Sequence, residues 1–484
     1  MVVTGRLAAV AAVAALIVMV AAPSWQGVLI ASVVLLGLIW ADSAAAARPL
    51  QARRRQRSVT TQGQRPGPIG TARAAGLELS RPSLTTVRVG RETAVELTVV
   101  NRGDWRIRGL LWDDWPGSAR ADRRTHRLQL GPNTKTRITT TLSPAYRGDR
   151  VAGPVTLRLV GPLGLAGWQT RREVPARVRA LPAFRSERVL SSKVKQLQQL
   201  EGRNVVNIRG QGAEFDSFRE YVAGDDVRAI DWRATARATD VLVRTWRPER
   251  NRHVLMLLDT GRFSAGLVGA SAGFAAGGTA AGTGGEQARE LRPVDPAEGT
   301  RLEASIEAAL LLGGLAAAAG DTVALLAYDR QVRAEVRAAS GKGLQPRLMH
   351  ALAGVVPALV DTDTPGLVRA AIQRTRRRSL VVWFTGLDGA MVEENLLPVL
   401  PVLAQRHRVL LVSVTDPDIA AAATRHTTAA DLYTAAAAEN LLAERALVRA
   451  SLRRKGIDVV TTSPDRLPEA LADEYLELKR SGSM

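Results

Sequence analysis

A long uncharged stretch near the amino end constrains this chain more than any other feature. No residue from Leu7 to Ala41 is charged. As one helix at about 1.5 Å per residue, the stretch would be far longer than the roughly 30 Å hydrocarbon core of a bilayer. A turn-like cluster, Pro23-Ser24-Trp25-Gln26-Gly27, interrupts it. We therefore expect a transmembrane hairpin in residues 1–47, with helices over about Leu7–Ala22 and Trp25–Ala41.

The flanking charges predict how this hairpin is oriented. Arg6 precedes the first helix, the turn is uncharged, and five arginines follow the second helix: Arg48, Arg53, Arg54, Arg55 and Arg57. Positive residues stay on the cytoplasmic side, so both ends and the soluble domains are expected in the cytoplasm. The alternative is a cleaved signal peptide ending at Val20-Ala21-Ala22, which leaves the second apolar stretch without a role. Residues 48–74 are expected to form a basic linker.

Charge and cysteine content narrow the function classes. The chain of 484 residues has a formal net charge of +20, from 66 Lys and Arg against 46 Asp and Glu. Arginine is spread along the chain, whereas a nucleic-acid binder concentrates its charge on one stripe. This spread disfavours a binder of nucleic acid or anionic lipid, which the net charge keeps as an alternative. Cysteine is absent, which excludes disulfides, cysteine zinc sites and thiol catalysis.

Residues 75–182 carry the pattern of short strands separated by turn signals. About seven strands in roughly 100 residues are typical of a β-sandwich, a fold that binds partners or spaces other domains. The expected strands are Thr85–Val89, Thr93–Val100, Ile107–Trp112, Arg127–Leu130, Thr134–Leu142, Val155–Val160 and Ala176–Leu181.

The densest pattern lies within residues 183–252, where acidic and basic residues alternate over short spacings. The pairs Glu214/Arg219, Asp225/Arg228 and Asp231/Arg237 predict a lattice of ion pairs. Aromatic and apolar residues are expected to anchor this lattice on a core: Phe215, Phe218, Tyr221, Ile230 and Trp232. Glu214 and Asp231 are also an alternative acid/base pair. Catalysis needs two pKa values pushed apart, whereas nearby arginines would lower both, so we expect no catalytic residue.

This segment resembles the bacterial family known as domain of unknown function fifty-eight. The matching residues are Gly212, Glu214, Phe215, Arg219, Tyr221, Gly224, Asp225, Arg228, Ile230, Asp231, Trp232, Ala236 and Arg237. The preceding segment adds Tyr146-Arg147-Gly148, Gly153-Pro154 and Gly161-Pro162-Leu163-Gly164-Leu165, with Gly161 where the family has an aspartate.

The resemblance implies a membrane hairpin, a β-sandwich and a von Willebrand factor A-like domain at the bacterial inner membrane. It also implies a partner, a MoxR-type AAA+ ATPase, with which such proteins are thought to assemble or activate other proteins. We expect a protein-interaction module without enzymatic activity.

Residues 253–484 read as a doubly wound α/β domain, because buried apolar strands alternate with helices. The expected strands are Val254–Asp259, Val323–Tyr328, Val332–Val336, Leu380–Thr385, Val409–Val414 and Gly456–Val460. The expected helices are Arg301–Ala319, 343–356, 366–377, 390–405, 432–455 and Pro464–Lys479.

The resemblance to von Willebrand A domains also implies a metal-ion-dependent adhesion site at the carboxyl ends of the strands. Its first loop reads D-x-S-x-S in that family, whereas this chain has Asp259-Thr260-Gly261-Arg262-Phe263. Thr385-Gly386 replaces a Ser-Asp pair, with Asp388 nearby, and Thr362 or Thr364 supplies the threonine. Hydroxyl and carboxylate ligands of Mg²⁺ are lost, so a vestigial site without stable Mg²⁺ is expected.

An insertion at 264–299, rich in Gly, Ala, Thr and Ser, contains the pattern G-x-S-x-G around Ser271. This pattern is a nucleophile elbow only between a strand and a helix. In low-complexity sequence we interpret it as a loop, with a hydrolase using Ser271 as the alternative.

Overall fold

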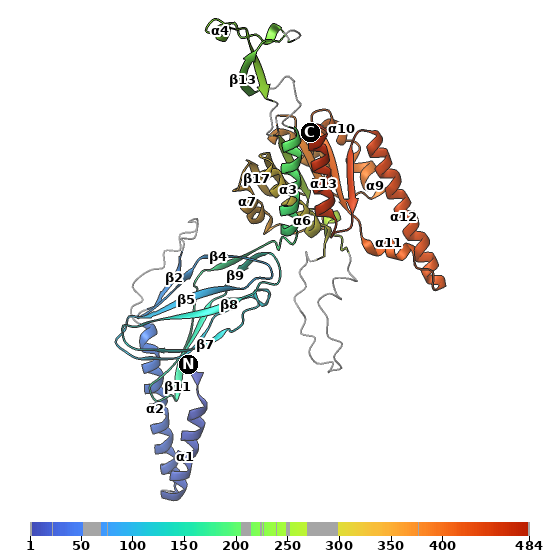
Figure 1. The fold of residues 1–484 in the computed structure, drawn as a ribbon. Helices are drawn as coiled ribbons and strands as arrows, with labels where there is room; N and C mark the ends of the chain where they lie inside the picture. Colours follow the sequence, from blue (N-terminus) through green and yellow to red (C-terminus); the bar gives the residue numbers. More distant parts are fainter. Residues whose placement is uncertain are drawn as a thin grey trace. The chain divides into compact units, whose positions relative to one another are not determined.

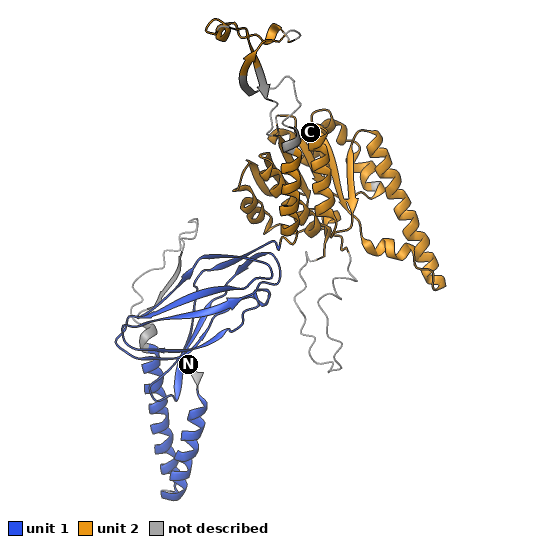
Figure 2. Cartoon of the chain, viewed as in Figure 1, with its two compact units in different colours: residues 1–183 blue, residues 184–484 orange. Residues whose placement is uncertain are grey.

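A computed structural model describes residues 2–21, 23–51, 69–74, 76–204, 214–222, 225, 227–238, 240–247, 252–268, 299–375 and 377–482. The chain divides into two compact units, residues 1–183 and 184–484 (Figure 2).

The first unit begins with two apolar helices that lie side by side, α1 (Gly5–Ala21) and α2 (Trp25–Gln51) (Figure 1). By length and composition, residues Trp25–Ala47 of α2 are sufficient to cross a membrane, a test that a signal sequence near the amino end also passes. The shorter α1 is likewise apolar. The helix that was expected to end near Ala41 instead continues to Gln51, into the predicted linker.

The exposure of α2 changes abruptly at Asp42. Val33, Leu36 and Trp40, which precede this position, are more than half exposed, whereas Asp42 is 1% exposed. The Asp42 carboxylate accepts hydrogen bonds from the backbone N–H groups of Leu163 (2.8 Å), Leu165 (2.7 Å) and Ala166 (2.9 Å). Hydrogen bonding of this kind is what allows a carboxylate to be buried.

The same contact accounts for the glycine that replaces the family's aspartate. A Cβ atom on Gly161 would lie 2.2 Å from Asp42 Oδ1, so the helix carboxylate occupies the space that a side chain at 161 would need. The chain before α1 also reaches this loop. Thr4 donates hydrogen bonds to the carbonyls of Gly164 and Leu165, and β1 (Val2–Val3) pairs with β11 (Ala166–Arg172).

The strands of the first unit form three sheets, with orders β1-β11-β10-β6-β7, β2-β3-β5-β8 and β4-β12-β9. The ladders are antiparallel except between β4 and β12. The remaining strands are β2 (Ile69–Ala74), β3 (Leu77–Pro82), β4 (Leu84–Arg88), β5 (Thr93–Asn101), β6 (Ile107–Trp112), β7 (Thr125–Leu130), β8 (Lys135–Leu142), β9 (Gly148–Val151), β10 (Val155–Val160) and β12 (Arg177–Leu181).

The seven expected strands are all present, with bounds shifted by at most two residues. β3, β9 and β11 are additional, and β2 lies in the predicted linker. Alternate residues of strands in the first two sheets meet in one buried cluster that includes Leu79, Leu97, Leu111 and Leu157. Burial of such side chains is the main stabilising contribution to this unit.

A buried ion pair joins the same two sheets. Arg81 on β3 donates a 2.7 Å hydrogen bond from Nη1 to Oδ1 of Asp113, and both residues are almost completely buried. Trp115 Nε1 and Thr140 Oγ1 donate to the other carboxylate oxygen at 2.8 and 2.9 Å. Burial lowers the pKa of the Arg81 guanidinium, and Asp113 opposes that shift. Because its partners are all present, the pair tolerates burial.

The second unit contains a six-stranded sheet of order β17-β16-β15-β18-β19-β20. Its strands are β15 (His253–Asp259), β16 (Thr322–Tyr328), β17 (Val332–Ala339), β18 (Leu380–Phe384), β19 (Arg408–Val414) and β20 (Asp458–Thr462). All neighbours are parallel except β16 and β17, so the sheet is parallel-rich with one antiparallel edge strand. The strand order reverses between β15 and β18, which is where α/β sheets commonly bind ligands.

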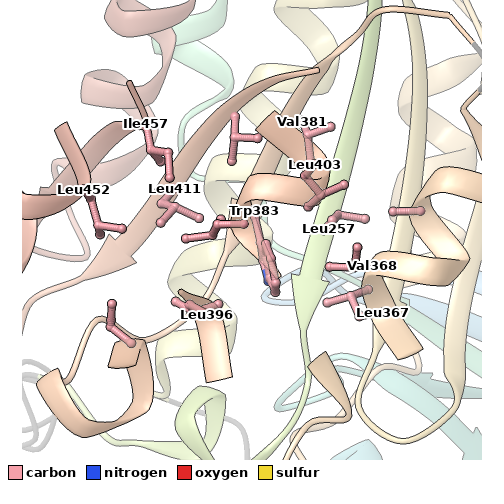
Figure 3. Packing of buried hydrophobic residues seen from close by; sticks show 14 of the residues in the cluster. Leu257, Leu367, Val368, Val381, Trp383, Leu396, Leu403, Leu411, Leu452 and Ile457 are labelled. Atoms are coloured by element: carbon pink, nitrogen blue, oxygen red, sulfur yellow. The ribbon is translucent and has the colours of Figure 1, made fainter. Parts of the chain in front are cut away.

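Helices cover both faces of this sheet. One face carries α6 (Arg301–Ala318), which packs against α3 (Glu187–Asn204), α7 (Leu344–Leu352) and α13 (Leu467–Arg480). The other face packs Leu257, Val381, Trp383 and Leu411 against side chains of α8 (Thr364–Arg374), α10 (Leu400–Ala404) and α12 (Ala429–Arg454) (Figure 3). The alternation of strands and helices therefore predicted this architecture correctly.

One helical prediction in this unit needs correction. The single helix expected over 390–405 is divided into α9 (Gly389–Met391), a π-helical turn at Val392–Leu396, and α10. Pro398 and Pro401 lack the N–H that a continuous helix needs, which explains the break. The helices α3 and α11 (Pro417–Ala423) were not predicted.

We predict that Asp42→Ala destabilises the first unit by on the order of 3 kcal/mol, because three buried N–H groups lose their acceptor. Ser43→Ala is the matched control, since the neighbouring Ser43 hydroxyl bonds only within its helix, to the Trp40 carbonyl. Denaturant unfolding in detergent, followed by near-UV circular dichroism, measures both variants. Equal stability of the two would contradict the anchoring role of Asp42.

Candidate interaction site

The described part of the family signature forms a small hairpin, which we call the signature hairpin. Its strands are β13 (Glu214–Glu220) and β14 (Leu242–Arg247), paired antiparallel with an irregularity between Phe215 and Ser217. A 3-10 turn (Val227–Ala229) and a short helix α4 (Trp232–Thr235) lie between the strands in sequence. An isolated bridge between Ile230 and Val243 joins this connection to β14.

One Arg–carboxylate pair fixes the turn that follows β13. Arg219 Nη1 and Nη2 donate to the two oxygens of Asp225 at 2.7 and 2.6 Å, a bidentate arrangement. The backbone N–H of Val222 donates to the same carboxylate at 3.0 Å. The hydrogen bond to Asp225 raises the pKa of the Arg219 guanidinium.

A second pair fixes α4. Asp231 caps this helix by accepting hydrogen bonds from the backbone N–H groups of Arg233 (3.0 Å) and Ala234 (2.9 Å). Arg244 Nε, on β14, donates to Asp231 Oδ2 at 2.6 Å. The backbone hydrogen bond from Ala234, followed by the one from Arg244, lowers the pKa of the Asp231 carboxyl. Asp231 is therefore an ionised structural group.

The predicted ion-pair lattice is present, but with different partners. Arg219 pairs with Asp225, and Asp231 pairs with Arg244 in place of Arg237. Short sequence spacing cannot find Arg244, because strand pairing brings it next to Asp231. Gly212 and Gly224, and the side chains of Glu214 and Phe215, lie outside the described residues.

The prediction that aromatic residues anchor the signature hairpin on a core is wrong for two of them. Trp232 is 68% exposed and Phe218 is 44% exposed, whereas Tyr221 and Ile230 are partly buried. Val222 and Val227 are exposed as well. We call Phe218, Val222, Val227 and Trp232 the signature surface. The other signature positions described, Arg228, Ala236 and Arg237, are also exposed.

A second cluster lies where β15 ends, at the reversal of strand order. Asp259 is 3% exposed and accepts hydrogen bonds from Thr362 Oγ1 (2.5 Å), Thr385 Oγ1 (2.9 Å) and the backbone N–H of Gly261 (2.8 Å). Burial raises the pKa of the Asp259 carboxyl, while the hydrogen bonds from Thr362, Gly261 and Thr385 oppose the rise.

The glycine in the first loop is closely surrounded. A Cβ atom on Gly261 would lie 2.1 Å from Thr362 Oγ1. The threonine hydroxyl therefore occupies the place where a serine side chain at 261 would begin. Phe263, at the other serine position, is partly buried against the core of the sheet.

The structure brings together only part of the predicted vestigial site. Thr362 contacts Asp259, whereas Thr364 is the buried first residue of α8 and donates to the Thr362 carbonyl at 3.4 Å. Asp388 instead accepts from Arg445 Nη2 (2.8 Å) and Arg301 Nη1 (3.4 Å). The sequence interpretation missed both arginines, because each comes from a distant helix. Among the described residues, no three His, Cys, Asp or Glu side chains gather as metal ligands.

The fold and these sites define a multidomain chain with apolar amino-terminal helices, mixed sheets and a parallel-rich sheet. A family model described as protein of unknown function DUF58 matches residues 217–266 and 296–422. This match confirms the resemblance seen in the signature segment, and it extends into the six-stranded sheet.

Relatives in mycobacteria are similar over part of the chain. Uncharacterized protein Mb1516 of Mycobacterium bovis and uncharacterized protein Rv1480 of Mycobacterium tuberculosis are each 27% identical over 220 residues. The aligned region is 45% of this chain and 60% of each relative. Among solved structures, the ASH/PapD-like domain of human CEP192 matches at 14% identity, covering 26% of this chain and 99% of that domain, with a TM-score of 0.17.

We predict that Asp259→Asn gains stability relative to the wild type as pH rises from about 4. A raised native pKa means that the folded wild type binds its proton more tightly than the unfolded chain does, so its stability falls as pH rises through this window. The asparagine variant has no such proton to lose.

Unfolding free energies of both proteins between pH 4 and 8 measure this difference. Asp361→Asn, at an exposed carboxylate of the Thr362 loop, is the control for general charge effects. A difference between wild type and Asp259→Asn that does not change with pH would contradict the proposed cost of burying this carboxylate.

Proposed function

We propose that the chain is a membrane-tethered protein-interaction module whose signature surface contacts another polypeptide. The observation that carries this proposal is that Trp232, Phe218, Val222 and Val227, which all belong to the signature hairpin, are exposed. Exposed apolar side chains in a group indicate an interaction site more than single ones do, and tryptophan is enriched at the centres of protein interfaces.

The two ion pairs support this role because they hold the surface in shape. Arg219–Asp225 fixes the turn before Val227, and Arg244–Asp231 fixes the helix that begins with Trp232. A surface that is ordered before binding loses less conformational entropy when a partner docks. The same contacts weigh against an acid/base role for Asp231, because a carboxylate with a lowered pKa is a poor proton donor. The hydrolase alternative depends on Ser271, which lies outside the described residues.

We propose that α1 and α2 form a retained hairpin in the bacterial inner membrane, with the soluble parts in the cytoplasm. The contacts of Thr4 with Gly164 and Leu165, and the pairing of β1 with β11, support retention over cleavage after Ala22. The arginines that follow α2 in sequence favour the cytoplasmic side.

We also propose roles for the two larger folded parts of the chain and the identity of the partner. The strands of residues 75–182 serve as a β-sandwich spacer, and residues 253–484 as a von Willebrand factor A-like domain. The sheet order and the loop around Asp259 support the second assignment. The family resemblance supports a MoxR-type AAA+ ATPase as the partner, in chaperone-like assembly or activation of other proteins.

We predict that Trp232→Ala reduces co-purification of the partner ATPase at least tenfold, since truncation of a central tryptophan removes about 2 kcal/mol or more of binding free energy. Trp112→Ala is the matched control, because Trp112 is also exposed but lies on β6. Quantitative mass spectrometry of detergent extracts from cells that make each variant is the measurement. Equal recovery of the ATPase with both variants, or none with the wild type, would argue against the proposal.

We also propose that the Asp259 cluster holds no Mg²⁺ at physiological concentrations, because its threonine hydroxyls already donate to the carboxylate. Calorimetric titration of the full chain is expected to give no saturable Mg²⁺ binding. Micromolar binding that is lost in Asp259→Ala would overturn this expectation.

A further inference from the structure

A cavity of about 190 Å³ lies at the carboxyl ends of β18 and β19. Its wall includes Ser413 from β19, Thr461 from β20, and Asp388 from the loop after β18. Arg301, the first residue of α6, completes the wall with Arg445 and Arg449 from α12. Arg301, Asp388 and Arg445 are mostly buried, with side-chain exposures of 17%, 33% and 14%.

The charges that line this cavity do not balance. Three arginines face a single carboxylate, that of Asp388. Arg445 Nη2 donates to Asp388 Oδ1 at 2.8 Å, and Arg301 Nη1 lies 3.4 Å from Oδ2. One carboxylate is therefore shared between two partly buried guanidinium groups, which leaves an excess of positive charge.

Hydrogen-bonding groups in the same wall also lack partners. Arg445 Nη1, Arg301 Nε and Thr461 Oγ1 are buried and have no hydrogen-bond partner among the described residues. A buried donor without an acceptor is costly, and folded proteins rarely leave several together. The three residues line one small positive cavity, and its wall holds more donor groups than the described residues satisfy, so an acceptor rich in oxygen would be stabilised there.

We propose that this cavity binds a small free oxyanion of the phosphate class. Guanidinium groups bind phosphate through paired N–H donors, and the threonine hydroxyl adds a further donor. The cavity is smaller than the roughly 300–1,000 Å³ of sites for larger ligands, so it suits the ion and not a nucleotide. Asp388 competes for the same arginines and weakens the site. This inference does not depend on the proposed function.

Isothermal titration of the full chain in detergent with inorganic phosphate, at constant ionic strength, tests the proposal. We expect saturable binding at one site. Arg445→Gln is expected to weaken binding about tenfold or more, because a guanidinium donor pair is lost. Arg454→Gln is the matched control, since Arg454 lies on the same helix and does not line the cavity. The same titration with acetate in place of phosphate tests whether a carboxylate binds in the cavity equally well.

The Asp388→Asn substitution is expected to change the affinity for phosphate in the opposite direction. A gain in affinity cannot come from a variant that fails to fold. Removing the competing carboxylate frees Arg301 and Arg445, so phosphate is expected to bind several-fold more tightly. The proposal is overturned by absence of saturable phosphate binding to the wild type, by equal weakening in Arg445→Gln and Arg454→Gln, by equal affinity for acetate, or by weaker binding in Asp388→Asn.

Discussion

A carboxylate removed from water needs hydrogen-bond donors, and this requirement organises each part of the chain. Asp42 takes three backbone N–H groups and thereby fixes the second apolar helix to the loop at 161–166. Asp113 joins two sheets through Arg81, Trp115 and Thr140. Asp231 caps a helix and binds Arg244, and Asp259 is held by two threonines. In each case the contact joins segments that are separate in sequence.

This use of carboxylates bears on function. Asp225 and Asp231 at the signature hairpin, and Asp259 at the carboxyl edge of the sheet, are engaged in structural hydrogen bonds. The four apolar side chains of the signature surface, by contrast, are exposed to solvent. Ordered polar contacts that present apolar groups are what a recognition surface needs, because the partner then supplies the burial. The arrangement therefore favours binding over catalysis as the basis of the proposed function.

Periodicity predicted the elements well and their contacts poorly. β6 and β10 have the bounds expected from alternation alone, and β15 and β19 follow from continuous apolar runs. The extension of α2 beyond Ala41 depends on Asp42 finding donors in a loop 121 residues away, which no local pattern contains. The partner of Asp231 is set by strand pairing, and the outward direction of Trp232 by the helix that Asp231 caps. From sequence alone, an aromatic residue is expected in a core. The exposure of Trp232 could therefore be found only in the structure.

The central claim is that the signature surface touches another polypeptide in the cell. A photo-reactive phenylalanine analogue placed at 232, activated in intact membranes, tests it directly, with the same group at 112 as the comparison. We expect a crosslinked adduct between position 232 and a second protein, and no such adduct from position 112. Adducts only with lipid, or identical adducts from both positions, would contradict it.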